Sequence, residues 1–184
     1  MPGKIAAILR ESKWFILIAA ALYLALVLFS FDKADPGWSH SGSGLQTRNS
    51  GGPVGAWVAD LLLYLFGVSA YWWVLLFVYA VLWGYRRLHR SSISDRRPFL
   101  IALSGFAILL AASSALEALR IHTITLALPL APGGMIGTAA SQLLGSTLGF
   151  TGATLVLLTL AAVGLSLFTG VSWLAVIEAL GTAL

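Results

Sequence analysis

Few side chains in this sequence have the type and spacing that chemistry requires. The three histidines, His40, His89 and His122, lie in separate polar segments without the short spacing of a metal site. There is no cysteine, which excludes a disulfide framework and a thiolate metal site. We find no phosphate-binding glycine loop and no arrangement that brings Ser, His and Asp together. We therefore expect no catalytic, metal-binding or cofactor-binding residue here, and not an enzyme.

Asp60 is the ionisable residue that most suggests a function. An acid inside a membrane span would by default indicate a proton relay. However, an internal repeat described below pairs Asp60 with Gln142, on the polar face of a short amphipathic helix. We therefore interpret Asp60 as interfacial. Glu117 and Arg120 lie three residues apart just past an apolar run, and we interpret them as a surface ion pair.

The elements that hold these residues are long apolar blocks. The 184 residues are 59% hydrophobic and 10% charged, whereas soluble domains are about 45–50% apolar and about 25% charged. Residues 14–31 and 99–116 each run 18 residues without a charge, and residues 61–85 run 25. A helix of 18 residues is about 27 Å long, close to the hydrocarbon thickness of a bilayer. The sequence predicts an integral membrane protein whose first apolar run is a retained anchor.

The basic residues predict the orientation. Eight of the eleven lysines and arginines lie in the N-terminal tail and in residues 86–98, and three lie in the other polar segments. By the positive-inside rule, both termini and residues 86–98 should be cytoplasmic. Residues 32–53 and 117–132 should then be outside.

An internal repeat organises the chain. Gly51–Gly84 and Gly133–Ser166, aligned without a gap, agree at 11 of 34 positions. The agreement includes four glycine pairs, Gly51/Gly133, Gly52/Gly134, Gly55/Gly137 and Gly67/Gly149. We interpret this as a tandem duplication, in which each half holds a span, an outer loop, a glycine-led interfacial helix, a glycine turn and a second span.

The second copy predicts what the glycine-led helix is. Polar or small residues recur at helical spacing on one face and apolar residues on the other. The first group is Thr138, Ser141, Gln142, Gly145 and Ser146, and the second is Ile136, Ala139, Ala140, Leu143 and Leu144. This pattern is typical of an amphipathic helix at the membrane surface, which Gly149 ends.

The predicted fold is all-α, with four transmembrane helices in two repeats. Residues 1–13 form a cytoplasmic tail. Residues 14–85 form the first repeat, with spans at about 14–31 and 68–85 and an interfacial helix at about 55–66. A basic cytoplasmic loop, 86–98, precedes the second repeat, 99–168, with spans at about 99–116 and 150–168 and an interfacial helix at about 134–148. Residues 169–184 form a juxtamembrane helix.

Small residues at four-residue spacing predict close helix packing. Ala107, Ala111 and Ala115 form such a row on the third span, as do Gly133/Gly137 and Gly145/Gly149. Packing within one subunit is the simpler interpretation, and contact between subunits is the alternative. No strong polar contact is visible in the spans, so we expect the isolated chain to be monomeric or loosely associated.

The C-terminal segment predicts a further amphipathic helix. Gly170 should end the fourth span, and Ser172 can cap the next helix. Apolar residues then fall on one stripe: Trp173, Val176, Ile177 and Leu180. Glu178 turns away from that stripe. We expect this helix to lie along the inner leaflet with Trp173 as its anchor, ended by Gly181.

Four blocks of the sequence resemble one known family. They are "DKADPGWSHSG", "GGPVGAWVADLLLYLFGVSAYW", "GGMIGTAASQLLGSTLGFTGATLVLL" and "LSLFTGVSWLAVIEALG". In this order they look like the four-helix N-terminal membrane domain of the FtsK/SpoIIIE DNA translocases, most of all the proteobacterial FtsK branch. The resemblance covers nearly the whole chain.

The resemblance implies an anchor in the bacterial inner membrane at the division septum. Such an anchor contacts the lipid bilayer and other cell-division membrane proteins, and assembles as a hexamer in the whole family protein. ATP, Mg²⁺ and DNA would bind only to a linker-tethered motor that this sequence lacks. An alternative function, a small transporter or channel subunit, is suggested by duplicated hairpins with glycine-broken helices, although the spans offer few mid-membrane polar groups.

Overall fold

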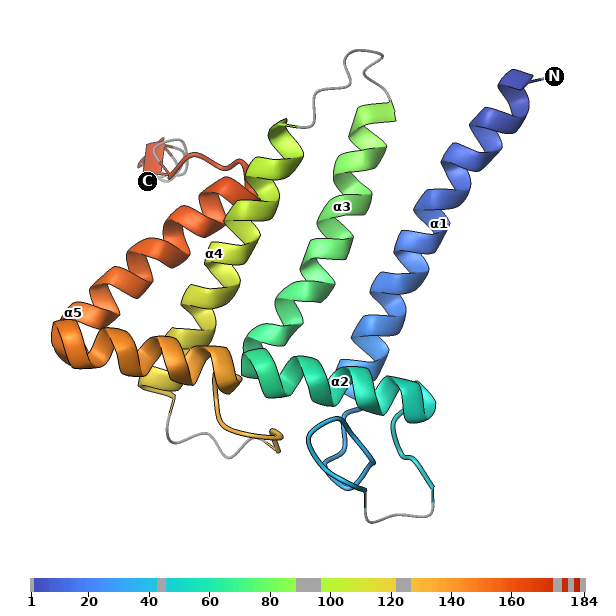
Figure 1. Cartoon of the computed structure of the whole chain (residues 1–184). Coiled ribbons are helices and arrows are strands. Elements are labelled where there is room, and N and C mark those ends of the chain that lie inside the picture. Colours follow the sequence, from blue (N-terminus) through green and yellow to red (C-terminus); the bar gives the residue numbers. More distant parts are fainter. Residues whose placement is uncertain are drawn as a thin grey trace. The chain divides into compact units, whose positions relative to one another are not determined.

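The computed structural model describes residues 2–42, 46–88, 97–121, 127–173, 177–178 and 181–182. All regular elements of these residues are helices (Figure 1). In chain order they are α1 (Pro2–Phe29), α2 (Gly52–Phe66), the short 3₁₀ helix η1 (Gly67–Tyr71), α3 (Trp72–Leu88), α4 (Arg97–Arg120) and α5 (Gly134–Thr169). The all-helical prediction is therefore confirmed.

Three helical stretches are long and apolar enough to cross a membrane. They are Gly52–Leu82, Arg97–Arg120 and Gly134–Thr169, and Trp14–Phe29 is a shorter apolar helix. The count of four spans stays a prediction. The helix α1 begins at Pro2, within the residues predicted as a cytoplasmic tail, and α2 begins at Gly52, close to the predicted start at about residue 55.

The chain divides into two compact units, which we describe separately. The first comprises residues 1–62 and 71–93, and the second comprises residues 63–70 and 94–184. In the first unit α1 packs against α3, with Val27 and Leu28 fully buried. The Tyr71 hydroxyl donates to the Leu28 carbonyl at 3.0 Å, and its ring lies 5.0 Å from that of Phe29. The C-terminal end of α1 is thus fixed to the start of the α3 segment.

In the second unit α4 packs against α5 through two glycines. A Cβ added to Gly164 would lie 2.6 Å from the Leu109 backbone N, and one added to Gly105 would lie 2.5 Å from the Phe168 backbone N. These distances show that the two helix backbones nearly touch, as is typical of small-residue packing in membranes. The rings of Phe106 and Phe168 lie 5.5 Å apart at one end of this contact.

The glycine-led segments of the two units share two features of their local geometry. Gly52 and Gly134 both have positive φ, at 66° and 61°, and both donate to the carbonyl three residues earlier. Gly55 N–H donates to Gly51 and Gly137 N–H to Gly133, at 3.2 and 3.0 Å. These pairs are the ones that the sequence alignment matched, while the duplication itself stays a prediction.

Each glycine-led helix ends at a second glycine with positive φ. Gly67 has φ 60° and begins η1, and Gly149 has φ 68° and bends α5 into two arms, Gly134–Leu148 and Phe150–Thr169. Figure 1 shows the bend in α5. Glycine adopts this backbone conformation without the steric cost that a Cβ would add. The predicted turns at Gly67 and Gly149 are confirmed.

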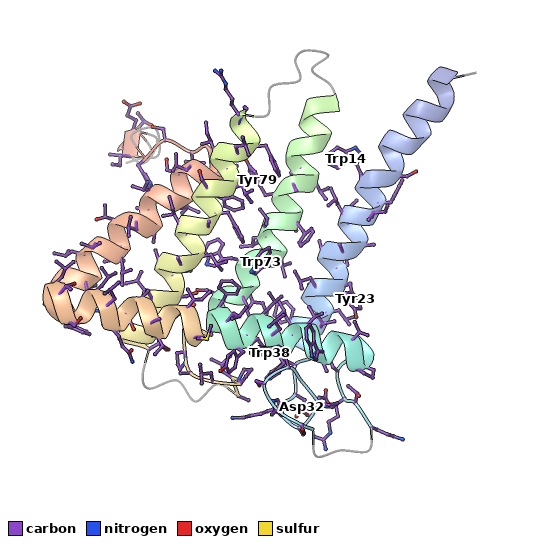
Figure 2. The ribbon with its side chains drawn as sticks, in the orientation of Figure 1. Trp14, Tyr23, Asp32, Trp38, Trp73 and Tyr79 are labelled. Carbon is purple, nitrogen blue, oxygen red and sulfur yellow. The ribbon has the colours of Figure 1, made fainter. Side chains whose placement is uncertain are left out.

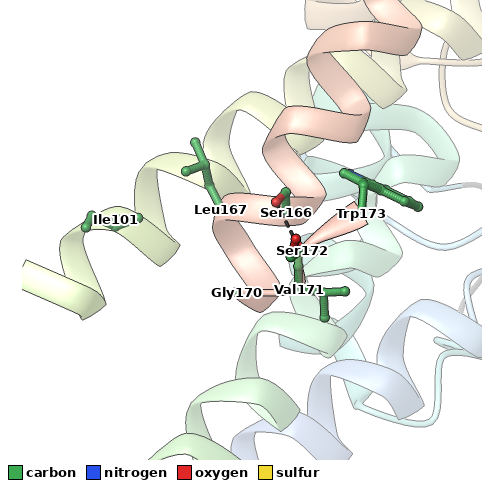
Figure 3. Close-up of a pocket in the computed structure, with 7 residues that line it drawn as sticks. All are labelled: Ile101, Ser166, Leu167, Gly170, Val171, Ser172 and Trp173. Carbon is green, nitrogen blue, oxygen red and sulfur yellow. Dashed lines mark hydrogen bonds between the residues drawn. The ribbon is translucent and has the colours of Figure 1, made fainter. Parts of the chain in front are cut away.

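The C-terminal segment turns back on α5. Gly170 has φ 72° and ends α5, and the Trp173 indole N–H donates to the Ala162 carbonyl at 3.1 Å. In a straight helix residues eleven apart would be separated by about 16 Å along the axis, so the segment does not continue α5. Ser166 Oγ donates to the Val171 carbonyl at 2.8 Å and secures the turn (Figure 3).

The juxtamembrane helix itself stays a prediction. Val176 and Leu180, two members of its apolar stripe, lie outside the described residues. Trp173, Ile177 and Glu178 are helical and exposed.

Candidate functional site

Asp60 anchors the first loop, which we define as residues 30–51. Asp60 is 1% exposed on α2, and both carboxylate oxygens accept hydrogen bonds from Ser39. The Ser39 backbone N–H donates to Oδ2 at 2.6 Å, and Ser39 Oγ donates to Oδ1 at 3.0 Å. His40 Nδ1 lies 3.6 Å from Oδ1. A Cβ on Gly37 would lie 2.5 Å from Asp60 Cγ, so only glycine fits against this carboxylate.

Two further buried polar residues hold the first loop against the end of α1. The Asp35 carboxylate accepts the backbone N–H groups of Arg48 and Asn49, both at 2.7 Å. Asn49 Nδ2 donates to the Val27 carbonyl at 2.8 Å and the Ser30 carbonyl at 3.2 Å. The last carbonyls of a helix have no partner within it, so Asn49 satisfies groups that the end of α1 leaves open. The described part of the loop is therefore a hydrogen-bonded structure.

An exposed ion pair closes the outside of this loop. Arg48 Nη1 lies 3.1 Å from Asp32 Oδ2, and the Ala34 backbone N–H donates to Asp32 at 2.9 Å. The Ala34 N–H and the Arg48 guanidinium together hold the pKa of Asp32 below its usual range. Figure 2 labels Asp32 and Trp38 in this loop, and the Trp38 side chain is 47% exposed.

In the second unit Glu117 binds the residue that precedes the glycine-led helix α5, as Asn49 does for α2 in the first unit. Glu117 Oε2 accepts the Gly133 backbone N–H at 3.1 Å, and Oε1 accepts the Ser69 hydroxyl. Ser69 Oγ lies 2.7 Å from Ser113 Oγ, so α4 and residues 63–70 are joined by a polar chain. In the first unit the Asn49 side chain likewise accepts the Gly51 N–H, at 2.9 Å.

Glu117 and Arg120 therefore do not form the predicted surface ion pair, because each has a separate partner. Arg120 donates from Nε and Nη2 to Thr154 Oγ1, at 3.2 and 3.1 Å. Its guanidinium carbon lies 4.5 Å from the centroid of the Phe150 ring. Arg120 thus joins the end of α4 to the second arm of α5.

The residues that the repeat singled out differ in burial: Gly55, Gly137 and Asp60 are packed, whereas Gln142 is exposed. Gly55 contacts Asn49 and Val27, and a Cβ on Gly137 would lie 2.2 Å from the Ser114 carbonyl oxygen. Gln142 is exposed although its repeat partner Asp60 is buried, because the first loop covers Asp60. The repeat therefore predicted the position of Asp60 in α2 but not its burial.

The predicted alanine row divides in the same way. Ala115 is fully buried, next to Ala112 and Leu157, whereas Ala107 and Ala111 are exposed. The close approach of α4 and α5 is made at Gly105 and Gly164, which the sequence interpretation missed, and contact between subunits through Ala107 and Ala111 stays a prediction. The signal for the two glycines was present in the sequence, since each lies inside an apolar run.

This arrangement binds helix ends and loops to one another through buried polar residues. Together with the long apolar helices, it defines an all-helical integral membrane protein. A family model described as the 4TM region of DNA translocase FtsK/SpoIIIE matches residues 6–181. The chain belongs to this family, and it is an inner-membrane domain rather than the motor of a translocase.

Named relatives agree with the family model. The chain is 45% identical over 98% of its length to DNA translocase FtsK 2 of Ralstonia nicotianae. It is 34% identical over 99% of its length to DNA translocase FtsK 1 of Neisseria meningitidis serogroup B, and 35% identical over 94% to DNA translocase FtsK of Shewanella oneidensis. It spans only 24%, 23% and 19% of these proteins, respectively. No solved structure matches the chain.

Proposed function

We propose that this chain is the membrane anchor and division-assembly domain of a septal DNA translocase. The observation that carries the proposal is the match of residues 6–181 to the 4TM region of FtsK/SpoIIIE, in relatives named DNA translocase that are about four times longer. ATP hydrolysis and DNA binding would belong to a motor outside these residues. The anchor would hold that motor at the division site and contact other division proteins in the membrane.

The first loop supports an assembly role. Asp35, Asn49 and Asp60 fix its described residues through buried hydrogen bonds, so it presents one surface rather than many. A partner that binds a fixed surface loses less conformational entropy on ordering it. Trp38 on this surface is the kind of residue that dominates binding energy at interfaces.

Localisation tests the proposal. The chain, fused to a fluorescent protein and produced at a low level in its own bacterium, should concentrate in a band at the division site. An unrelated four-helix inner-membrane protein with the same reporter is the control and should label the envelope evenly. An even envelope signal from both fusions would contradict the septal function.

Topology is a separate test of the orientation that an anchor needs. The eight-to-three distribution of basic residues supports an orientation with residues 32–53 outside and residues 86–98 inside. Alkaline phosphatase, which is active only outside, should be active when fused after Gly44 and inactive when fused after Ser92. Activity on the same side for both fusions would rule out the proposed arrangement.

We also propose that the C-terminal segment sets where the motor's tether begins. The turn at Gly170 and the bond from Trp173 to Ala162 return the chain to the side of α5. Trp173→Glu should remove both this bond and the apolar ring, and so weaken septal function of the whole protein while leaving membrane insertion intact. Trp173→Phe also loses the bond but keeps an apolar ring, so function retained in this variant would assign the effect to the ring, and function lost would assign it to the bond.

A further inference from the structure

A cavity of about 500 Å³ opens in the second unit where α4 ends beside the second arm of α5. The residues that line it include Ser113, Leu116, Glu117, Arg120, Thr154 and Leu158. None of the predictions from sequence used this cavity. Its lining combines one arginine, one carboxylate and leucine side chains. Such a lining suits an amphipathic ligand, which has a charged head and an apolar tail.

The arginine is held in a fixed orientation. Both of its hydrogen bonds go to Thr154 Oγ1, and its guanidinium carbon lies over the Phe150 ring. Thr154 Oγ donates its own proton to the Phe150 carbonyl at 2.8 Å, so its lone pairs face Arg120. A guanidinium has five N–H donors. Two of these donors bind Thr154, so within the described part of the chain three remain for a ligand. The Arg120 side chain is exposed, so a ligand can reach them.

The depth of the cavity in a bilayer follows from the length of α4. Arg97–Arg120 is long and apolar enough to cross a membrane. Twenty-four helical residues span about 36 Å, slightly more than the roughly 30 Å hydrocarbon core. The Arg120 guanidinium therefore lies at the level of lipid headgroups, and the Leu116 and Leu158 walls extend toward the acyl chains.

The charges select the headgroup. Arginine recognises phosphate through paired N–H bonds. Glu117, one helical turn before Arg120, lines the same cavity, and its carboxylate, which also accepts the Ser69 hydroxyl and the Gly133 N–H, adds a negative group to the lining near Arg120. A carboxylate there favours a headgroup with an ammonium next to its phosphate and disfavours one that is anionic only.

We propose that this cavity binds one zwitterionic phospholipid of the phosphatidylethanolamine type. Arg120 holds the phosphate, Glu117 attracts the ammonium, and an acyl chain lies along Leu116 and Leu158. The bound lipid fills the space between the end of α4 and the second arm of α5. This inference does not depend on the septal function proposed above.

Lipid titration tests the site directly. The purified, delipidated chain is titrated with short-chain phosphatidylethanolamine, short-chain phosphatidylglycerol and inorganic phosphate, and retained lipid is counted by native mass spectrometry. Phosphatidylethanolamine should bind at least several-fold more tightly than phosphatidylglycerol, and inorganic phosphate should not compete at equal concentration. Equal affinity for the two lipids would overturn the headgroup assignment, and competition by free phosphate would overturn the lipid.

Variants of Arg120 test the charge separately from the apolar walls of the cavity. Arg120→Gln should weaken phosphatidylethanolamine binding about tenfold, the effect of losing one charge-assisted contact. Arg120→Lys, which retains the charge, should recover part of it. Binding by Arg120→Gln within twofold of the native chain, with unchanged helical circular dichroism, would overturn the role of Arg120.

A matched pair of leucine variants tests the apolar walls of the cavity without altering its charge. Leu158 lines the cavity and is 53% exposed, whereas Leu155, on the same arm of α5, is 62% exposed and lies outside the lining. Leu158→Trp should fill the groove and reduce binding, and Leu155→Trp should not. An equal loss in both variants would show that the protein has no defined site there.

Discussion

The contact between α4 and α5 depends on the absence of a side chain at Gly164, and Gly164→Ala tests this. The added Cβ would lie 2.6 Å from the Leu109 backbone N and 2.9 Å from the Gly105 carbonyl oxygen. Ordinary contacts of Cβ begin near 3.4 Å. The distance from the added Cβ to the Leu109 backbone N is about 0.8 Å shorter than that, so the helices would have to separate by about this amount. Both obstacles are backbone atoms, which cannot rotate away.

The magnitude follows from two opposing terms. Overpacking of this kind costs about 1–3 kcal/mol. Replacing a mid-helix glycine by alanine returns at most about 0.5–1 kcal/mol. We therefore expect Gly164→Ala to lower the free energy of unfolding by about 1–2 kcal/mol.

Gly145→Ala is the matched control on the first arm of the same helix. Its Cβ would meet only Leu119 Cδ1, at 4.0 Å, so this variant should be as stable as the native chain or slightly more stable. Unfolding is followed by titration with sodium dodecyl sulfate, using fluorophores on cysteines introduced into α4 and α5, since the native chain has none. If Gly164→Ala unfolds at the same detergent fraction as Gly145→Ala, the close backbone contact is refuted.

Three further predictions concern the loop, its acid and the subunit count. Asp60→Ala should increase hydrogen exchange in the described residues of the first loop because Ser39 loses both acceptors. Gln142→Ala, at the exposed repeat position, should leave exchange unchanged in residues 127–133, which precede its helix; equal behaviour of the two variants would contradict the anchoring role. The Asp32 carboxyl should titrate in a carbon NMR experiment below the ordinary aspartate midpoint of about 3.9. A group with a lowered folded pKa stabilises the fold above its unfolded pKa and loses that effect as pH falls through its folded pKa, so the Asp32–Arg48 contact should persist at neutral pH and weaken only in strong acid; a midpoint at or above 3.9 would be inconsistent with this. The isolated chain should be a monomer or a loose oligomer in mild detergent, and Ala111→Leu should not destabilise it, since Ala111 is exposed; a stable hexamer that this substitution disrupts would show that the spans drive assembly.

The sequence predicted the features that depend on local geometry. Gly67 and Gly149 were found as turns because a glycine that ends an amphipathic pattern has one common structural role. The end of α5 at Gly170 followed from the same reasoning. Repetition at a fixed offset of 82 residues made these positions more reliable than any single glycine would have been.

Long-range contacts could not be predicted from periodicity. Asp60 is buried because Ser39, 21 residues earlier, folds over it, and no helical pattern contains that information. Gly105 and Gly164 pack through the faces that meet, and a sequence of one apolar helix does not show which face that is. For the same reason Ala107 and Ala111, chosen by spacing alone, are exposed. Glu117 was paired with Arg120 because the two are close in the sequence. The groups that Glu117 binds are the Ser69 hydroxyl and the Gly133 N–H.

We have proposed that this chain is the membrane anchor and division-assembly domain of a septal DNA translocase, and its assembly role can be tested without the motor. The most direct test removes the whole translocase from the bacterium and supplies residues 1–184 in its place, with membrane levels of the chain checked by immunoblot. If the assembly role is correct, cells should again form septa and divide, while chromosomes should be trapped at the septum because the motor is missing. Persistent undivided filaments, with the chain present in the membrane at the normal level, would contradict it.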